Sequence, residues 1–310
     1  MAARSAERFE LASGELRATV SSLGATLRDY SVRGVPILWG SSIDDLPIGA
    51  AGQVLAPWPN RLDGGSYDFD GVHAVAALDE PVRNNAIHGL VRWLYWERVE
   101  QTLDRVKLRC PLAPQPGYPF PVGLAVVYAL GESGLSVRVE AETNRAGGIP
   151  FGLGFHPYFS AGPAGLLGGR LRIDAKEHLL LDDRALPDGS EALQGKLGDL
   201  ASASGLLLDD VDLDDCFKRL SRDESGATSV RFLPGSGDLA EVVVELDSSF
   251  DYVMCYTGGT LPFEHRRRAI AIEPMTCAPN AFNSGDGLLR VTPAEPFRAS
   301  FSISATLVDR

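Results

Sequence analysis

The chain alternates between apolar and polar positions with a period of two over long stretches. Apolar residues alternate through two neighbouring segments, Val122, Leu124, Val126, Tyr128 and Leu130 in the first and Leu135, Val137, Val139 and Ala141 in the second. Ser136, Arg138 and Glu140 occupy the opposite face of the second segment, and Gly131 and Gly134 mark a turn between the two. A period of two is that of a strand with one buried face, so the pattern predicts a hairpin.

The rest of the chain also favours short strands. The alternation returns from Phe297 to Leu307, and shorter candidates are Leu16–Val20, Ser66–Phe69, Trp96–Val99, Val106–Cys110, Leu171–Ile173 and Val242–Leu246. Glu191–Leu200 is the only plausible helix. The 33 glycines and 20 prolines supply the many tight turns that such strands need. Without strand–helix alternation, repeats or a low-complexity linker, we expect an all-β, large antiparallel β-sandwich forming a single domain over residues 1–310.

Charge and composition reduce the number of function classes that fit the chain. With 29 basic and 41 acidic residues, the formal net charge is −12, which repels nucleic acid and favours a small-molecule partner. No apolar run reaches membrane-spanning length, and the first ten residues lack the apolar stretch of a signal peptide. The four cysteines form no C-x-x-C pair, so we expect free, buried thiols. We therefore expect a cytoplasmic protein that binds neither nucleic acid nor a membrane.

Polar residues gather among aromatic residues and glycines in four segments. They are Pro57–Asp63, Asn84–Trp93, Pro150–Phe159 and Ile272–Ser284, and Asp214–Phe217 is a weaker fifth. Sugars suit such surroundings, because their C–H faces pack on aromatic rings while their hydroxyls need fixed donors and acceptors. No G-x-G-x-x-G motif opening a helix, P-loop or H-E-x-x-H occurs, so we expect no cofactor and no metal.

Each polar residue taken alone also has a structural interpretation. His156 suits a core histidine, Arg61 an ion pair with Asp63, and Glu273 a buried carboxylate paired with an arginine. The other histidines outside the four segments are expected on the surface, namely His73, His178 and His265.

The ordered segments decide between these interpretations, because together they resemble the aldose 1-epimerase (galactose mutarotase-like) family from about Phe9 to the final strand. The matching pieces are N-R-L-D-G-G-x-Y-x-F-D-G at Asn60–Gly71, N-A-I-H-G-L-V at Asn85–Val91, P-F-G-L-G-F-H-P-Y-F at Pro150–Phe159 and E-P-M-T-C-A-P-N-A-F-N-S at Glu273–Ser284. The resemblance implies a large antiparallel β-sandwich and a mutarotase that interconverts the anomers of a hexose.

The resemblance also implies roles for individual residues. Glu273 takes the place of the base that deprotonates the anomeric hydroxyl, and His156 that of the acid that protonates the ring oxygen. Members of the family hold sugar hydroxyls with an arginine, a histidine and an aspartate. The arginine and the histidine correspond to Arg61 and His88 in this chain. The aspartate falls best on Asp214, with the adjacent Asp215 as the alternative.

After His88 the sequence departs from the family's pattern, so the identity of the sugar stays undetermined. The family's best-known galactose enzymes carry a second glycine where this chain has Leu90, and the tail continues with Arg92 and Trp93, which either reshape the pocket or are structural. We include Asn60 and Trp93 among the expected sugar-binding residues. A nearby arginine also allows an anionic sugar, phosphorylated or sulfonated.

Two other classes of function compete with the mutarotase. A catalytically silent carbohydrate-binding module would not need both Glu273 and His156. A glycoside hydrolase or lyase would use a second carboxylate, for which Asp214 is the candidate. The sequence does not indicate the oligomeric state.

Overall fold

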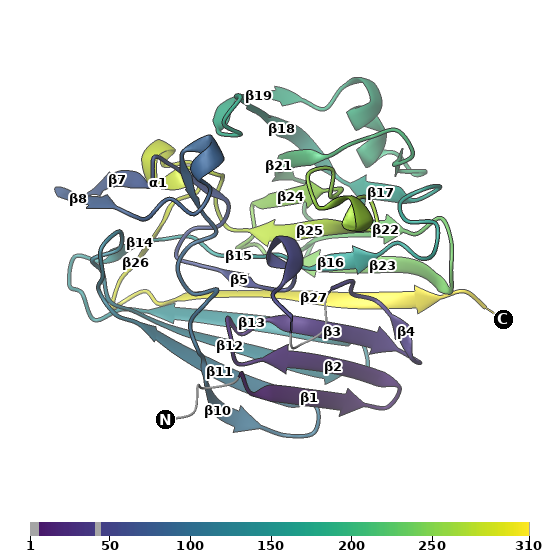
Figure 1. Cartoon of the computed structure of the whole chain (residues 1–310), viewed down its shortest axis with the longest axis horizontal. Helices are drawn as coiled ribbons and strands as arrows, with labels where there is room; N and C mark the ends of the chain where they lie inside the picture. Colours follow the sequence, from purple (N-terminus) through teal and green to yellow (C-terminus); the bar gives the residue numbers. More distant parts are fainter. Residues whose placement is uncertain (1–5, 41–44, 310) are drawn as a thin grey trace.

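The structure is a computed structural model that describes residues 6–40 and 45–309. Its largest layer is a nine-stranded antiparallel sheet (Figure 1). In sheet order its strands are β10 (Glu97–Gln101), β11 (Arg105–Leu112), β12 (Val122–Gly131), β13 (Gly134–Glu142), β27 (Phe297–Leu307), β23 (Leu239–Leu246), β22 (Thr228–Leu233), β17 (Arg170–Ile173) and β20 (Leu206–Leu207). The predicted hairpin is β12–β13, and the predicted C-terminal strand is β27, which pairs with β13 and β23.

A second large sheet carries Asp214 and Glu273, and His156 lies between two of its strands. Its strands, in order, are β19 (Pro187–Ala192), β18 (Ala175–Leu181), β21 (Asp214–Leu220), β24 (Tyr252–Tyr256), β25 (Ala269–Met275), β15 (Gly154–Phe155) and β5 (Val54–Leu55), and β16 (Tyr158–Ser160) also pairs with β25. All seven residues of β25 are buried, so both of its faces are covered.

Smaller elements complete the molecule. A four-stranded sheet holds β1 (Arg8–Ser13), β2 (Leu16–Ser21), β3 (Leu27–Val32) and β4 (Val35–Pro36), and two-stranded pairs join β6 (Arg61–Asp63) to β9 (Asn85–Ile87), β7 (Ser66–Phe69) to β8 (Val72–Val75), and β14 (Ile149–Phe151) to β26 (Leu289–Val291). In the described part of the chain the helices are α1 (Ala281–Ser284) and four 3-10 segments, Ile48–Ala50, Pro81–Arg83, Gly195–Ala201 and Phe263–His265. The helix expected at Glu191–Leu200 is wrong at its start, because Glu191 belongs to β19 and only a 3-10 segment follows.

The core lies where the large sheets face each other. Phe301 of β27 packs against Phe155 of β15 and against Phe250 just before β24, with ring centroids 4.8 and 6.0 Å apart. One hydrophobic cluster runs from Phe9 to Ile303 through these layers. The protein is therefore an all-β antiparallel sandwich, as predicted, while the expectation of a single domain stays a prediction.

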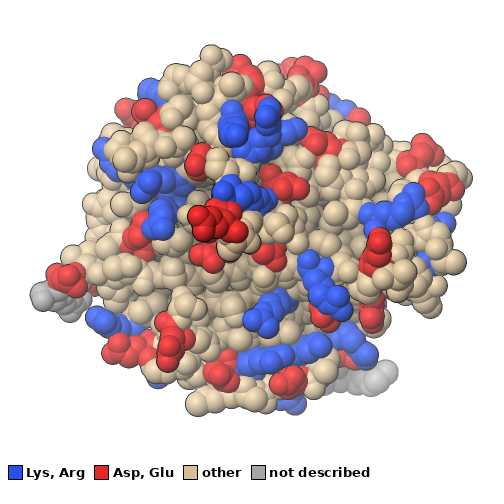
Figure 2. Space-filling model, turned by 180° about the vertical axis from the view of Figure 1, so that it is seen from behind, with Lys and Arg blue, Asp and Glu red and all other residues tan. Residues whose placement is uncertain are grey.

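Other sequence expectations concern charge, thiols and the ends of the chain. All four cysteines are buried and free. Within the described residues no helix is long and apolar enough to cross a membrane. Figure 2 shows basic and acidic side chains interspersed in small groups over one face. The first five residues, which belong to the segment considered for a signal peptide, lie outside the described part of the chain.

The alternation along β27 makes a testable prediction. Phe301→Ala removes a buried ring that joins the two large sheets, and a cavity of this kind costs about 3 to 5 kcal/mol of unfolding free energy. Urea denaturation checks this value. Ser302→Ala, on the opposite face of the same strand, is the matched control and should change it by less than about 0.5 kcal/mol. Equal losses in the two variants would contradict the assignment of faces.

Candidate active site

A cavity of about 250 Å³ opens beside β25 and is lined mainly by polar side chains. One part of its wall comes from residues 60–92, which include β6 and β9, and another from β16, β21, β24 and β25. Residues 49–50 and 260–261 add to the lining. The polar lining residues are Asn60, Arg61, Glu80, Arg83, His88, Arg92, His156, Tyr158, Asp214, Tyr256, Thr260 and Glu273. Four of the polar sequence segments thus reach the same cavity from distant parts of the chain, along with Asp214 from the fifth.

Glu273 and His156 meet in the wall of this cavity. Glu273 lies on β25 opposite Met254, and His156 lies between β15 and β16, where both its backbone groups are bonded to residues 52 and 53. Nε2 of His156 is 3.3 Å from Oε1 of Glu273. The remaining polar atoms, Nδ1 of His156 and Oε2 of Glu273, are buried without a hydrogen bond to any described residue. Buried atoms of this kind need a partner, which a bound ligand can supply.

Burial dominates the protonation of the pair. It raises the pKa of Glu273 well above its ordinary value, and the Asp214 carboxylate adds to the increase while Arg61 opposes it. It lowers the pKa of His156 to about 3, and the Arg92 charge acts in the same direction. Both shifts favour the neutral forms. At neutral pH the imidazole is therefore uncharged, and burial disfavours ionisation of the carboxyl group beside it.

His88 faces His156 edge to face, with ring centroids 5.3 Å apart. Its Nδ1 accepts the backbone N–H of Asn60 at 3.3 Å. Burial lowers the pKa of His88 well below its ordinary value, so the ring is neutral and carries its proton on Nε2. Gly89 makes this placement possible, because a Cβ there would lie 2.1 Å from the carbonyl oxygen of Ala56.

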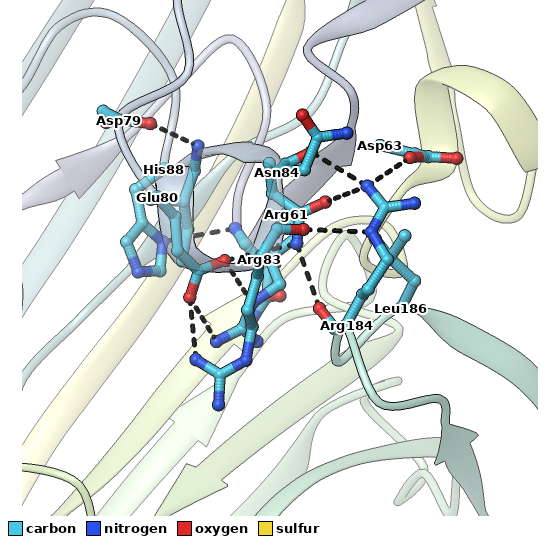
Figure 3. Close-up of polar contacts among 12 residues, drawn as sticks. Arg61, Asp63, Asp79, Glu80, Arg83, Asn84, His88, Arg184 and Leu186 are labelled. Carbon is cyan, nitrogen blue, oxygen red and sulfur yellow. Dashed lines mark hydrogen bonds and ion pairs between the residues drawn. The ribbon is translucent and has the colours of Figure 1, made fainter.

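Arg61 begins β6 and points its guanidinium at Glu80 (Figure 3). Nε and Nη2 of Arg61 bond the two carboxylate oxygens at 2.9 and 3.1 Å. Arg83 and Asn85 donate to the same carboxylate. The ion pair that a buried arginine requires is therefore made with Glu80, and Asp63 pairs instead with Arg184.

Asp214 and Asp215 point in different directions from the first two positions of β21. Asp214 lines the cavity, and no hydrogen bond or ion pair with a described residue occupies its carboxylate. Asp215 bonds Nδ1 of His178 at 3.0 Å. The expectation of a surface position for His178 is wrong, because it is buried between Asp215 and Glu191. Successive side chains of a strand alternate between its faces, which explains the separation.

Trp93 is not part of the cavity lining, in contrast to the expectation that it contacts the sugar. Its side chain lies in the turn after Val91 and is about half exposed, with Arg92 5.7 Å from the ring centroid. Arg92 itself does line the cavity and pairs with Asp79 at 2.7 Å. The buried Val91 and Trp96 anchor this turn, so the exposed position falls on Trp93.

Sequence reasoning missed several residues of the wall. Tyr158 stacks on His156, with ring centroids 5.0 Å apart, and lay within a quoted segment without being singled out. Glu80 precedes a 3-10 turn without a periodic pattern, and Arg83 is the last residue of that turn. The one sequence feature that could have pointed to them is their position a few residues before His88. Tyr256 and Thr260 come from a strand end and a loop whose residue types are unremarkable in the sequence.

Two curated relatives align with nearly the whole chain or most of it. The uncharacterised Escherichia coli K12 protein YihR is 30% identical over 300 residues, which cover 96% of this chain and 93% of YihR. Galactose mutarotase of Sus scrofa is 26% identical over 282 residues, which cover 82% of this chain and 79% of the porcine enzyme.

Solved structures share the fold. An aldose epimerase homologue from C. elegans superposes with a TM-score of 0.82 at 19% identity, covering 98% of this chain and all of that one. Galactose 1-epimerase of Lactobacillus acidophilus gives a TM-score of 0.76 at 18% identity, covering 97% and 94% of the two chains. The family model described as aldose 1-epimerase matches residues 7–304. The chain therefore belongs to the aldose 1-epimerase family.

Proposed function

We propose that this protein is an aldose 1-epimerase that interconverts the α and β anomers of a hexose without a cofactor. The observation that carries the proposal is the buried Glu273–His156 pair, with two unpartnered polar atoms beside a polar cavity. Family membership and the porcine relative's activity on galactose support the same reaction class.

The reaction needs one proton removed and one supplied. Glu273 takes the proton of the anomeric hydroxyl while His156 gives a proton to the ring oxygen, and the bond from C1 to that oxygen breaks. The resulting aldehyde rotates about C1–C2, and the reverse transfers close the ring on the other face. A positioned acid and base contribute about 10²- to 10⁴-fold to such a rate.

The pKa shifts of the pair bear on this scheme. Both favour the neutral forms, so Glu273 reaches the ionised state of a base by passing its proton to His156. The 3.3 Å separation of Oε1 and Nε2 allows the transfer with little movement. Arg61 favours the ionised carboxylate, so it lowers the cost of forming the active ion pair.

The remaining polar residues suit a substrate with several hydroxyls. Nε2–H of His88 is a donor, the Asp214 carboxylate is an acceptor, and Arg61 and Asn60 complete the same wall. Fixed donors and acceptors of both kinds are what a hexose needs. A silent binding module would not require the acid–base pair, and a hydrolase would require Asp214 to act as the second carboxylate.

Optical rotation tests the proposal. Freshly dissolved α-D-glucose or α-D-galactose should mutarotate faster with the protein than in buffer, and Glu273→Gln should reduce the protein-dependent rate by about 10²-fold or more. Glu177→Gln, which removes a partly exposed carboxylate paired with Arg219, is the control and should retain the rate. An unchanged rotation rate for a panel of sugars would refute the mutarotase, and release of reducing ends from a glycoside would indicate the hydrolase.

The lowered pKa of His156 predicts the acid side of the pH profile. The active pair carries one proton, gains a second only as the pH falls toward the His156 pKa of about 3, and loses its last as the pH rises through the raised Glu273 pKa. Blank-corrected kcat/KM should therefore show no loss as the pH falls from about 7 to about 5. A loss of activity on the acid side of about pH 6.5, the ordinary histidine value, would contradict the lowered pKa of His156.

Arg83 favours a second candidate substrate, a hexose with an anionic substituent. Its guanidinium lines the cavity at 34% side-chain exposure and uses only Nη1, which bonds Glu80. Its other two nitrogens have no hydrogen bond to a described residue. A phosphate or sulfonate at the mouth of the cavity would find a bidentate donor there.

Comparing two sugars tests this candidate. If Arg83 binds an anionic group, Arg83→Gln should raise KM for glucose 6-phosphate by about 10-fold and leave KM for glucose within about twofold. Polarimetry with both sugars gives the values. Equal changes for the two sugars would exclude an anion-binding role.

A further inference from the structure

Glu80 lies in the cavity wall, but its acceptor positions are already occupied. Its Oε2 accepts from Nε of Arg61 at 2.9 Å and from Nδ2 of Asn85 at 3.2 Å. Its Oε1 accepts from Nη2 of Arg61 at 3.1 Å and from Nη1 of Arg83 at 3.0 Å. A carboxylate offers about four lone-pair sites, so Glu80 has none left for a sugar hydroxyl.

Asp214, in the same wall, is in the opposite situation. No hydrogen bond or ion pair with a described residue occupies its carboxylate, so it can accept from a ligand. The two carboxylates therefore differ in role although both line the cavity. Glu80 serves the protein's own donors.

We propose that Glu80 is the positioning residue that orients Arg61 toward the substrate. Two parallel bonds to one carboxylate fix the plane of the guanidinium and leave Nη1 of Arg61, which bonds no described residue, as its free donor. Arg61 is 7% exposed and needs a counter-charge at this depth. The inference rests on the proposed function, because Arg61 contacts a sugar only if this cavity binds one.

The ionisation of Glu80 agrees with that role. Burial alone would raise its pKa, but the hydrogen bonds and charge of Arg61, with help from Asn85 and Arg83, lower it below the ordinary value. Glu80 thus remains a charged acceptor at neutral pH. A neutral amide of the same shape would present a donor to at least one of the groups that now bond it.

The loop that carries Glu80 is held from outside the cavity by Arg184 in the turn between β18 and β19 (Figure 3). Arg184 donates to the carbonyl oxygens of Arg83 and Asn84, at 2.9 and 2.8 Å, and to the side chain of Asn85 at 3.0 Å. It also pairs with Asp63 at 2.6 Å. The position of this loop is therefore set by residues that do not line the cavity.

Glu80→Gln tests the proposal through the split between KM and kcat. Losing an oriented donor that acts equally on ground and transition states raises KM and leaves kcat unchanged. We expect KM for galactose to rise by about 10- to 100-fold, as for other hydrogen bonds to charged groups, and kcat to stay within about threefold. Glu177→Gln, which breaks the ion pair between Glu177 of β18 and Arg219 of β21, is the matched control and should change neither value.

A second variant shows whether Glu80 acts through Arg61. In an Arg61→Gln background, adding Glu80→Gln should raise KM by less than about threefold, because the group it positions is already gone. Equal effects in the two backgrounds would overturn the proposal, as would a loss of kcat with KM unchanged. Glu80→Asp keeps the charge but shortens the side chain, so it should also raise KM; it provides the test if Glu80→Gln does not fold.

Calorimetric binding of galactose to the same variants separates this proposal from the proposed function. If the wild-type protein binds galactose without accelerating mutarotation, the catalytic function fails, and Kd replaces KM with the same expected changes. If the wild-type protein neither binds nor converts any sugar of the panel, both proposals fall.

Discussion

The burial of a carboxyl group against an imidazole constrains the whole site. Glu273 lies on β25, a strand with no exposed residue. His156 lies between β15 and β16, which both pair with β25. Both side chains are buried, so a net charge on the pair is costly, whereas a proton transfer from one partner to the other leaves the net charge unchanged. We therefore infer that the pair acts as one unit that shares one proton. This property suits a reaction that removes a proton at one atom and returns one at another.

The surrounding charges fall into two groups. Glu80 and Asp79 are occupied by arginines, so they stabilise the wall. The carboxylate of Asp214, Oε2 of Glu273 and Nδ1 of His156 make no hydrogen bond to the described residues. Polar groups left unsatisfied at a buried site reduce stability and favour ligand binding, a trade-off expected of an active site.

The sequence predicted the parts of the fold that depend on local periodicity. The strands at Val122–Gly131 and Phe297–Leu307 follow from strict alternation, because each buries one face against a large core. In the segment Glu191–Leu200, the first two residues pair with β18, and the helical part is a 3-10 segment that begins only at Gly195. The expectation of a surface position for His178 failed because its partner is Asp215, which is 37 residues away along the chain.

The site was predicted in the same uneven way. The quoted motifs contain Asn60, Arg61, His88, His156 and Glu273, which all line the cavity. Trp93 was also expected there, but its exposure depends on how its turn packs. Glu80 escaped notice because its importance lies in four donors, contributed by three side chains, that converge only in the folded chain. A loop without periodicity gives no sign of such convergence.

Whether Glu273 and His156 act as one unit is tested most directly by anomer exchange at equilibrium. NMR saturation transfer between the α and β anomeric protons of galactose gives the exchange rate for wild type, Glu273→Gln, His156→Asn and the double variant. The account predicts that each single variant loses nearly as much of the protein-dependent rate as the double variant, because a single proton serves both residues. Losses that multiply in the double variant, or a single variant with near wild-type exchange, would contradict it.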